Sequence, residues 1–565
     1  MTESTLPSTE DRFKRLTAVL IALVTVAIAI ITYLQSDAGA RDDAANRDTK
    51  RYSLEAFGKQ MSGDARVNFD YNSAYQAYYE LELLAESARV VGDEAAARRY
   101  ETLRDNMTGL SPMLASPYFD AANDTLLVEK YEADTYLVEI VALQERFAAA
   151  SAVKDAWDSK SNTYIVHLTL LAVSLFLYGL SATISGKTTR WIFAGVGSAI
   201  TVVAVIWAAA TFIQPVNDLR QCRTADGASA IDAYAQGVGL AHQNDFEGAI
   251  ASFDTALACE SNYANSLVER GNANMALGSY EAAVADYERA RAAGNTSAAV
   301  AGDLAWTYYL LGRFDEAIAM NRTALSVDPN ELWIQYDLGL SLLAAGRIDE
   351  AKAEYQKGMD LAVKQVAEAQ AANLEPPSFL WWGLEDAALG LDELWFVIET
   401  GEGSPPPDTL ADSESTSAAA FELSTNLKSL SVGLELTGQP PTGSLTASLS
   451  PFTFAETIYD ENGDFVDYAA TDTFPYGSFE VSVLFDYEGM ADGQEVVFKV
   501  YIDGEEDPSW RVVDSWSLGS SGGAEKLISF AYSNTAILRP GVYTVEMYVD
   551  SHLAQSGNFE VEEEQ

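Results

Sequence analysis

Basic side chains are scarce in this chain of 565 residues, which has 35 lysines and arginines against 83 aspartates and glutamates. The resulting formal net charge of −48 repels the phosphates of DNA and RNA, so we expect no nucleic-acid partner. Two explanations of the acidity stay open. One is a well-solvated exterior or an adaptation to salt, and the other is the recognition of cationic partners or divalent ions.

Histidine is scarce as well, with only His167, His242 and His552, and the sequence has no His-Glu-x-x-His or Cys-x-x-Cys pattern. Such patterns supply metal ligands or reactive groups in many enzymes. Pairs of carboxylates are too abundant here to single out one pair for acid–base catalysis. We therefore expect no catalytic residues, no cofactor and no metal site, and we predict that the protein is not an enzyme.

One segment weakly resembles a calcium-binding loop, with the candidate ligands Asp460, Asn462, Asp464 and Asp467. An EF-hand requires glycine at the sixth position of its loop, which is Phe465 here. The pair Asn462-Gly463 between apolar runs favours a type I′ hairpin turn instead. The turn is the preferred interpretation, and calcium binding stays as the alternative.

Long apolar runs are present in three places, Leu16–Leu34, Tyr164–Ile184 and Trp191–Ile213. Each is long enough to cross a bilayer as a helix. We predict transmembrane helices at 16–35, 164–185 and 191–213. The first run could instead be a signal peptide cleaved near Ala38-Gly39-Ala40, but its apolar stretch is longer than is usual for one.

The distribution of basic residues predicts the orientation of these helices. Arg12, Lys14 and Arg15 precede the first run, while Lys187 and Arg190 lie between the other two. The positive-inside rule then places residues 1–15 and 186–190 in the cytoplasm, and residues 36–163 and everything after 213 outside. Arg41, Arg47, Lys50 and Arg51 follow the first run and weaken the asymmetry. The predicted location is a multi-pass cell-membrane protein with its large domains outside the cytoplasm.

A pattern repeats four times with a period of 34 residues. Small residues recur at this spacing in two rows, Gly237, Gly271, Ala305 and Gly339 in one and Ala249, Ala283, Ala317 and Ala351 in the other. A third row is formed by Phe253, Tyr287, Asn321 and Tyr355, and a fourth by Phe246, Tyr280, Phe314 and Ile348. Small residues let helices approach closely, and aromatic residues fill the gaps between helix pairs.

The period and the segments at 312–330 and 345–355 resemble the tetratricopeptide repeat (TPR) family. The resemblance implies an α-solenoid of about four helix–turn–helix units over 230–363, with a stalk at 214–229 and a helical cap at 364–400. Asn321 and Gly358 depart from the family pattern and suggest looser local packing. A TPR solenoid binds a protein or peptide in its groove, which here would be lined by Tyr234, Asn265, Val268, Asn272, Trp306, Tyr309, Trp333 and Tyr336. None of these is basic, so a clamp for a C-terminal carboxylate is not expected.

The two cysteines of the chain lie 37 residues apart, Cys222 before the first repeat helix and Cys259 near the end of the second. Because these two helices are antiparallel, the cysteines come together in space and can form a disulfide. A disulfide requires an oxidising side of the membrane, so its presence would agree with the outside placement. The sequence leaves the bridge open.

The remaining segments complete the predicted architecture. Residues 36–163 have a helical pattern, 401–420 have the composition of a linker, and 421–565 alternate with the period of β-strands, as in an immunoglobulin-like or fibronectin-like sandwich. The predicted fold is multidomain α plus β: three transmembrane helices, a helical extracytoplasmic domain, an α-solenoid and a C-terminal all-β sandwich.

We therefore predict a membrane-anchored scaffold or receptor that binds a protein partner through the groove. Two alternatives stay open: a sensor whose ligand binds residues 36–163, and a structural component of a cell-envelope assembly. The identity of the partner and the oligomeric state do not follow from the sequence.

Overall fold

The computed structural model describes residues 9–120, 125–224, 227–411, 413–459, 465–529 and 538–563. The chain divides into two compact units, Met1–Gly294 and Asn295–Gln565. The first unit contains long helices followed by two helix pairs. The second contains two further helix pairs, two more helices and a β-sheet region.

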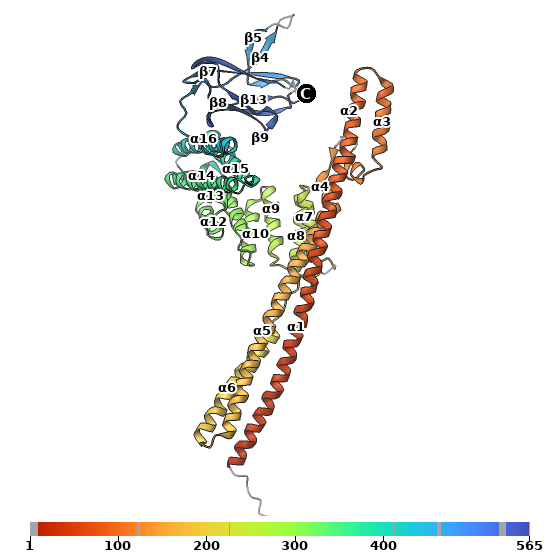
Figure 1. Ribbon diagram of the computed structural model, residues 1–565, viewed down its shortest axis with the longest axis vertical. Helices are drawn as coiled ribbons and strands as arrows, with labels where there is room; N and C mark the ends of the chain where they lie inside the picture. Colours follow the sequence, from red (N-terminus) through yellow and green to blue (C-terminus); the bar gives the residue numbers. More distant parts are fainter. Residues whose placement is uncertain are drawn as a thin grey trace, which may run out of the picture. The chain divides into compact units, whose positions relative to one another are not determined.

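Three helices of the first unit lie side by side along much of their length (Figure 1), namely α1 (Thr9–Phe69), α5 (Val138–Thr183) and α6 (Lys187–Ile213). No proline occurs between Pro7 and Pro112 or between Pro117 and Pro215, so nothing interrupts these helices by removing a backbone N–H donor. All three are long and apolar enough to cross a membrane, judged by length and composition. Their shared core includes Tyr164, Leu171 and Tyr178.

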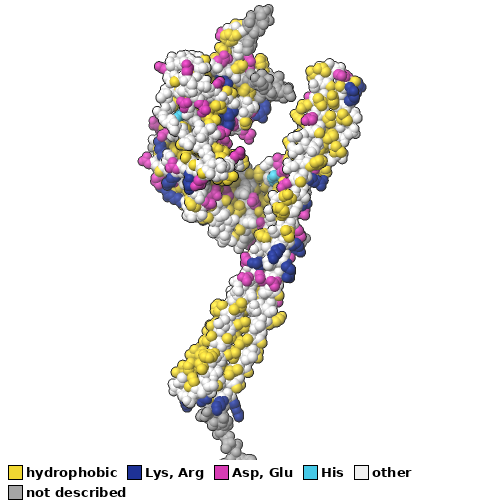
Figure 2. Space-filling model, viewed as in Figure 1, with side chains coloured by type: hydrophobic (Ala, Val, Ile, Leu, Met, Phe, Trp, Pro, Cys, Tyr) yellow, Lys and Arg dark blue, Asp and Glu magenta, His cyan; other side chains and the backbone are white. Residues whose placement is uncertain are grey.

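The apolar part of this bundle ends in basic residues. Figure 2 shows a hydrophobic stretch with lysines and arginines at the end where α1 begins. The rings of Phe13 on α1 and Trp191 on α6 meet there, 5.0 Å apart, and the Arg190 guanidinium lies 5.0 Å from the Phe13 ring centroid. The start of α1 and the loop between α5 and α6 are therefore at the same end of the bundle. Farther along, a band of both basic and acidic side chains follows the hydrophobic stretch (Figure 2).

The segment between α1 and α5 is mostly helical. Its elements are η1 (Asp70–Tyr75), α2 (Gln76–Val90), α3 (Glu94–Met107), η2 (Pro112–Leu114), β1 (Phe119–Asp120), β2 (Thr125–Leu126), α4 (Val128–Glu132) and η3 (Ala133–Leu137). The helix pair α2 and α3 packs together, and a small core forms around Tyr78 and Phe119, whose rings are 5.2 Å apart. The strands β1 and β2 pair antiparallel.

The first unit ends in a 3₁₀ turn, η4 (Leu219–Gln221), and two antiparallel helix pairs, α7 (Ala230–His242) with α8 (Phe246–Cys259) and α9 (Ala264–Ala276) with α10 (Tyr280–Ala292). The second unit begins with two more, α11 (Ala298–Leu310) with α12 (Phe314–Val327) and α13 (Leu332–Ala344) with α14 (Ile348–Ala371). The helices recur with the expected 34-residue period.

Two helices follow the last repeat, α15 (Ser378–Thr400) and α16 (Ser413–Thr437), with the turn η5 (Pro407–Thr409) between them. The structure differs here from the expected linker at 401–420 and sandwich from 421, because α16 spans that boundary. Its face of Leu423, Leu427, Leu430 and Leu434 is buried, which explains why a Ser- and Ala-rich stretch forms a helix rather than a flexible linker. The segment after this turn also contacts the repeats: the Ala411 amide donates to the Ala344 carbonyl at 3.2 Å.

The C-terminal region consists of two sheets. One has the strand order β10-β8-β12-β13-β6 with β9 on β8, and the other has the order β11-β7-β4-β5 with β3 on β7. The strands are β3 (Ser448–Leu449), β4 (Thr453–Tyr459), β5 (Phe465–Ala470), β6 (Thr473–Phe474), β7 (Glu480–Glu488), β8 (Glu495–Ile502), β9 (Glu505–Glu506), β10 (Val512–Ser515), β11 (Ser521–Ser529), β12 (Gly541–Val549) and β13 (His552–Val561), with the turn η6 (Pro508–Trp510).

One hydrophobic core joins the two sheets, with Val483 and Phe485 from β7, Phe498 from β8 and Met547 from β12 among its buried members. This is a two-layer β structure, and the immunoglobulin-like topology stays a prediction. The letters Gly-x-Ser-x-Gly occur at 519–523, but Ser521 begins the antiparallel strand β11 there, whereas a nucleophile elbow places the serine between a strand and a helix.

The weak calcium candidate falls mainly outside the described residues. Asp460, Asn462 and Asp464 belong to the part that the structure does not describe, and Asp467 lies on β5. In the part of the chain that is described, no group of three or more histidine, cysteine, aspartate or glutamate side chains could hold a metal ion.

Candidate functional site

In three of the four helix pairs, a glycine of the first helix packs against an aromatic ring of the second. A Cβ atom on Gly237 would lie 2.5 Å from the Phe253 ring, and one on Gly271 or Gly339 would lie 2.7 Å from the ring of Tyr287 or Tyr355. Since real Cβ contacts are longer, only glycine permits these approaches. The row of glycines that begins at Gly237 and the row of aromatic residues that begins at Phe253 therefore contact each other in these three repeats.

The two departures from the family pattern are packed differently from what we expected. Gly358 does not loosen the last repeat, because the ring of Tyr336 occupies the space that a Cβ would need. In the third repeat, Ala305 and Asn321 replace the glycine and the aromatic residue together, and both are fully buried. The larger residue on one side therefore accompanies a smaller one on the other.

In the first unit, helix α5 lies against the first helix of the first repeat. Val138 of α5 occupies the space that a Cβ on Gly239 of α7 would need, and Val138 and Val141 pack with Ile231 and Ala235. Arg146 of α5 donates to Asp232 of α7 at 2.5 Å. The side of α7 that faces α5 is thereby covered by the chain itself.

Four of the predicted groove residues belong to this unit. Tyr234 is buried against Phe253 and Tyr263, and Val268 packs against the same cluster. Asn265 donates to a carboxylate oxygen of Glu145 on α5 at 2.8 Å, and Asn272 accepts from the Tyr287 hydroxyl at 2.7 Å. The structure thus gives these four residues partners within the unit rather than bringing them together around a cavity.

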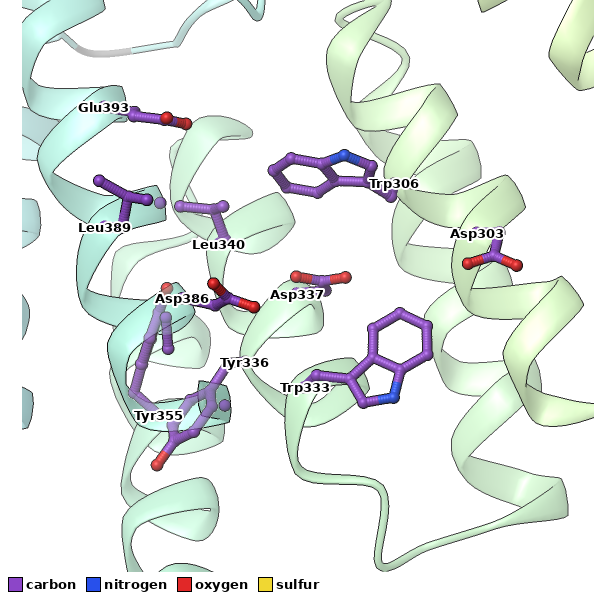
Figure 3. Close-up of a pocket in the computed structure, with 13 residues that line it drawn as sticks. Asp303, Trp306, Trp333, Tyr336, Asp337, Leu340, Tyr355, Asp386, Leu389 and Glu393 are labelled. Carbon is purple, nitrogen blue, oxygen red and sulfur yellow. The ribbon is translucent and has the colours of Figure 1, made fainter. Parts of the chain in front are cut away.

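The other four predicted residues belong to the second unit, and three of them line one cavity of about 360 Å³ (Figure 3). We call it the Trp306–Trp333 cavity. Its lining includes Trp306 of α11, Trp333 and Tyr336 of α13 and Tyr355 of α14. The fourth predicted residue, Tyr309, does not line it but stacks on the Trp306 ring at 5.0 Å with an angle of 18° between the ring planes.

Four carboxylates share this cavity, namely Asp303 of α11, Asp337 of α13 and Asp386 and Glu393 of α15. Lysine, arginine and histidine are absent from the residues that line it within the described chain. Burial, followed by the charges of Asp386 and Asp303, raises the pKa of Asp337 to about 8. Burial also raises the pKa of Asp386, and burial together with Asp386 and Asp392 raises the pKa of Glu393.

The acidic residues were not among the predicted groove residues, although part of the signal is in the sequence. Glu269, Asp303 and Asp337 are 34 residues apart and so occupy the same position in three successive repeats. Asp386 and Glu393 are seven apart, on one face of α15. Which face of α15 turns toward α13 depends on tertiary packing, where Gly383 and Gly390 bring α15 close to Leu332 and Leu340.

Outside the cavity, Cys222 and Cys259 are joined by a disulfide, with their Cα atoms 5.9 Å apart. The bridge ties the segment after α6 to the end of α8. Of the three histidines, His167 is fully buried beside Trp207, His242 is 3.0 Å from Glu132, and His552 lies at the start of β13. They lie on separate elements.

Comparison with known proteins identifies the repeats. Two family models described as tetratricopeptide repeat match residues 257–330 and 303–362. No curated protein matches the chain. Among solved structures, YrrB, described as a TPR protein with an unusual peptide-binding site, is 17% identical, and the match covers 34% of this chain and 86% of that one with a TM-score of 0.24.

MamA from Desulfovibrio magneticus RS-1, residues 41 to the end, is 18% identical, with 34% of this chain and 96% of that chain covered and a TM-score of 0.24. A crystal form of MamA AMB-1 is 22% identical, with 29% and 84% covered and a TM-score of 0.24. The family matches and the helix pairs confirm the prediction from the sequence: this chain contains tetratricopeptide repeats.

Proposed function

We propose that this protein is a membrane-anchored scaffold that binds a protein partner outside the cytoplasm through the Trp306–Trp333 cavity, without catalysing a reaction. Tetratricopeptide repeats are protein-interaction modules. The observation that carries the proposal is the cavity itself, where two half-buried tryptophans on the first helices of two repeats line a space that the described chain leaves unfilled. Partly exposed aromatic residues in a concave site are typical anchors for a partner.

Membrane anchoring is supported by the three apolar helices and by the position of charge along them. Exposed side chains such as Leu23, Val26, Val202 and Ile206 cover the bundle over the length of the predicted spans. In water such a surface would favour aggregation, whereas in a bilayer it meets lipid.

The proposed orientation rests on two independent features. The basic residues Arg12, Lys14, Arg15, Lys187 and Arg190 gather at one end of the bundle, which favours the cytoplasm for that end. The disulfide between Cys222 and Cys259 follows the last predicted span and favours an oxidising compartment on the opposite side.

A labelling experiment tests the orientation. Cells expressing Ser185→Cys or Ser517→Cys are treated with a membrane-impermeant thiol reagent; both serines are exposed, one in the loop before α6 and one in the sheet region. We expect Ser517→Cys to react in intact cells and Ser185→Cys only after lysis, with Cys222 and Cys259 reacting only after reduction. The reverse pattern would place the repeats in the cytoplasm and overturn the orientation.

Partner binding is tested by placing a photocrosslinking amino acid at Trp306 and, as a matched control, at Trp382 of α15, which is 66% exposed and does not line the cavity. We expect a discrete crosslinked protein at Trp306 that disappears in the Trp333→Ala background and is absent at Trp382. Equal crosslinking at both positions would contradict a role for the cavity.

One observation favours the sensor as a second candidate. Helix α5 runs without a break from residues that contact the first repeat to the end of a predicted span. A conformational change caused by a ligand in the region before α5 could therefore be transmitted along one continuous helix. A sensor should show ligand-dependent thermal stabilisation of the full-length protein that persists in the Trp333→Ala variant.

A further inference from the structure

The Trp306–Trp333 cavity combines two aromatic walls with carboxylates from three helices. Figure 3 shows Asp337 and Asp386 pointing into the space between α11, α13 and α15, with Trp306 and Trp333 facing it. Asp337 is half-buried, whereas Asp386 and Glu393 are exposed at the rim. In the described part of the chain, these three carboxylates form no salt bridge, although salt bridges are frequent elsewhere in the molecule.

The tryptophans are held in place before any ligand arrives. Trp306 stacks on Tyr309, which is only 2% exposed. The ring of Trp333 lies directly over Gly302 of α11, where a Cβ atom would overlap it. A preorganised aromatic surface loses little conformational entropy on binding, and its negative π-face attracts cations.

A buried hydroxyl gives a second, independent indication of a missing ligand. Tyr355 is fully buried, and within the described residues its hydroxyl has no hydrogen-bond partner. It lines the cavity, and in Figure 3 its hydroxyl points toward the level of the carboxylates, whereas that of Tyr336 points away. Leaving a buried hydroxyl unpaired is unfavourable, and a hydrogen-bond donor from a ligand would offset that loss.

The geometry argues against two other kinds of ligand. A divalent metal needs several oxygen ligands within about 2.6 Å of one point, and the described carboxylates are nowhere grouped closely enough to hold one. An apolar side chain would leave the carboxylates desolvated and unpaired, which is costly. An organic cation satisfies both the aromatic walls and the carboxylates.

We propose that the Trp306–Trp333 cavity binds the positively charged side chain, lysine or arginine, of a peptide segment of the protein partner. The inference rests on the proposed scaffold function and names the chemistry of what is bound. The cationic group lies between Trp306 and Trp333 with Asp337 beneath it, and Asp386 and Glu393 attract it from the rim. Asp337, which holds a proton near neutral pH in the free protein, releases that proton to solvent when the cation binds. The volume of about 360 Å³ falls at the lower end of the range for small-ligand sites, roughly 300–1,000 Å³, and suits one side chain rather than a folded element.

The test uses full-length protein in detergent and five-residue peptides with blocked ends, Gly-Gly-X-Gly-Gly, titrated by calorimetry. X is arginine, lysine, citrulline or acetyl-lysine. We expect the arginine or the lysine peptide to bind at least about tenfold more tightly than its neutral analogue, which corresponds to about 1.4 kcal/mol. Equal binding of charged and neutral peptides, or no binding of either charged peptide up to about 1 mM, would overturn the inference.

Variants assign the binding to the cavity. Asp337→Asn and Trp333→Ala should each weaken binding of the charged peptide at least about fivefold. Glu402→Gln removes one exposed acidic charge in the same unit away from the cavity and should leave the affinity unchanged. If all three variants weaken binding alike, the attraction is a property of the acidic surface as a whole, and the inference fails.

Two further arms separate the possible failures. Blocked arginine alone, binding as tightly as the peptide, would assign the cavity to a small free cation rather than a protein segment. In the crosslinking assay at Trp306, loss of the partner in Trp333→Ala but not in Asp337→Asn would keep the scaffold function and reject the cationic side chain. Loss in neither variant would reject both.

Discussion

At the scale of single residues, the repeats depend on matched pairs of small and large side chains. Gly237, Gly271 and Gly339 each face an aromatic ring, whereas the third repeat has the buried residues Ala305 and Asn321 at the equivalent positions. The positions of the glycines and aromatics could be predicted from the 34-residue period. The partnership between them could not, because a period shows which positions are equivalent but not which of them touch.

Asn321 occupies the position that an aromatic residue has in the other three repeats. Its side-chain amide is fully buried, and neither its oxygen nor its nitrogen has a hydrogen-bond partner within the described residues. Leucine is nearly isosteric and has no polar atoms, so we expect Asn321→Leu to raise the free energy of unfolding by about 1 kcal/mol. The measurement is thermal unfolding of the full-length protein. A lower midpoint for this variant would show that the amide is satisfied, for example by buried water.

Asp337 makes the stability of the second unit depend on pH. Its pKa is raised to about 8 in the folded protein by burial and by Asp386 and Asp303, against an ordinary value near 3.8 in the unfolded chain. Between about pH 4 and pH 8 the folded state retains a proton that the unfolded state has lost, so the stability contributed by this group falls as the pH rises through that range. Asp386, Glu393 and Tyr355 face the same space, and none of them supplies a compensating positive charge.

Asparagine cannot lose a proton in this way. We therefore expect Asp337→Asn to raise the free energy of unfolding near pH 8.5 by an amount on the order of 2 kcal/mol and to leave it unchanged near pH 4. Calorimetry at the two pH values checks this. The same variant should bind a cationic peptide less well. Asp337 would then lower the stability of the free protein and strengthen the binding of the peptide. A difference that persists unchanged at pH 4 would show that titration is not its cause.

At the scale of elements, the least predictable helix is α16. Its serines, alanines and preceding prolines have the composition of a linker, and only burial of its leucine face makes it a helix. It packs against the sheet region through Val432, Val497 and Tyr548. Composition indicates how an isolated segment behaves in water. It could not predict α16, because this helix is stabilised by burial of its leucine face.

A charged network strengthens this contact. Lys428 of α16 lies 2.7 Å from Glu546 of β12 and 2.9 Å from Asp392 of α15. Burial alone would lower the pKa of Lys428, but the two carboxylates outweigh it and raise the pKa. The Glu546 side chain is only 2% exposed, so it depends on this partner.

We expect Lys428→Met to lower the free energy of unfolding by about 3 kcal/mol, because it leaves a buried carboxylate without its counter-charge. The control is Lys352→Met, which removes an exposed ion pair with Glu422 and should change stability by less than about 0.5 kcal/mol. Adding Glu546→Gln to Lys428→Met should recover part of the loss. Equal small effects of both lysine variants in urea unfolding would contradict the prediction.

Helix α5 holds the first repeats through specific hydrogen bonds. The Glu145 carboxylate accepts from the Tyr263 hydroxyl at 2.7 Å and from Asn265 at 2.8 Å. We expect Glu145→Ala to weaken this docking by about 1–3 kcal/mol and to speed hydrogen exchange in α7 and α9. Glu129→Ala, at an exposed position, should leave exchange in these helices unchanged. Acceleration that spreads equally over α1 and α6 would indicate global destabilisation instead.

At the scale of the whole molecule, the order of regions follows from the sequence, and their contacts do not. The helical spans were predictable from long apolar runs, the repeats from a period of 34 residues and the sheet region from a period of 2. The same periods predicted one groove along all four repeats. Four of its eight proposed residues instead have partners within the first unit. Asn265 bonds to Glu145 of α5, which is remote in sequence, while Tyr234, Val268 and Asn272 contact residues of the repeats.

The contact between α5 and the first repeat also sets the distance between that repeat and the predicted membrane span. Ala149 is the last residue of α5 in the cluster shared with α7, and the predicted span begins at Tyr164, fifteen residues later. At 1.5 Å per residue, these fifteen residues span about 22 Å. In the proposed orientation, the contact between α5 and the first repeat therefore ends about 22 Å from the edge of the hydrocarbon core. In that orientation, this part of α5 would act as a spacer, and its length would favour partners that extend far enough from the membrane to reach the repeats.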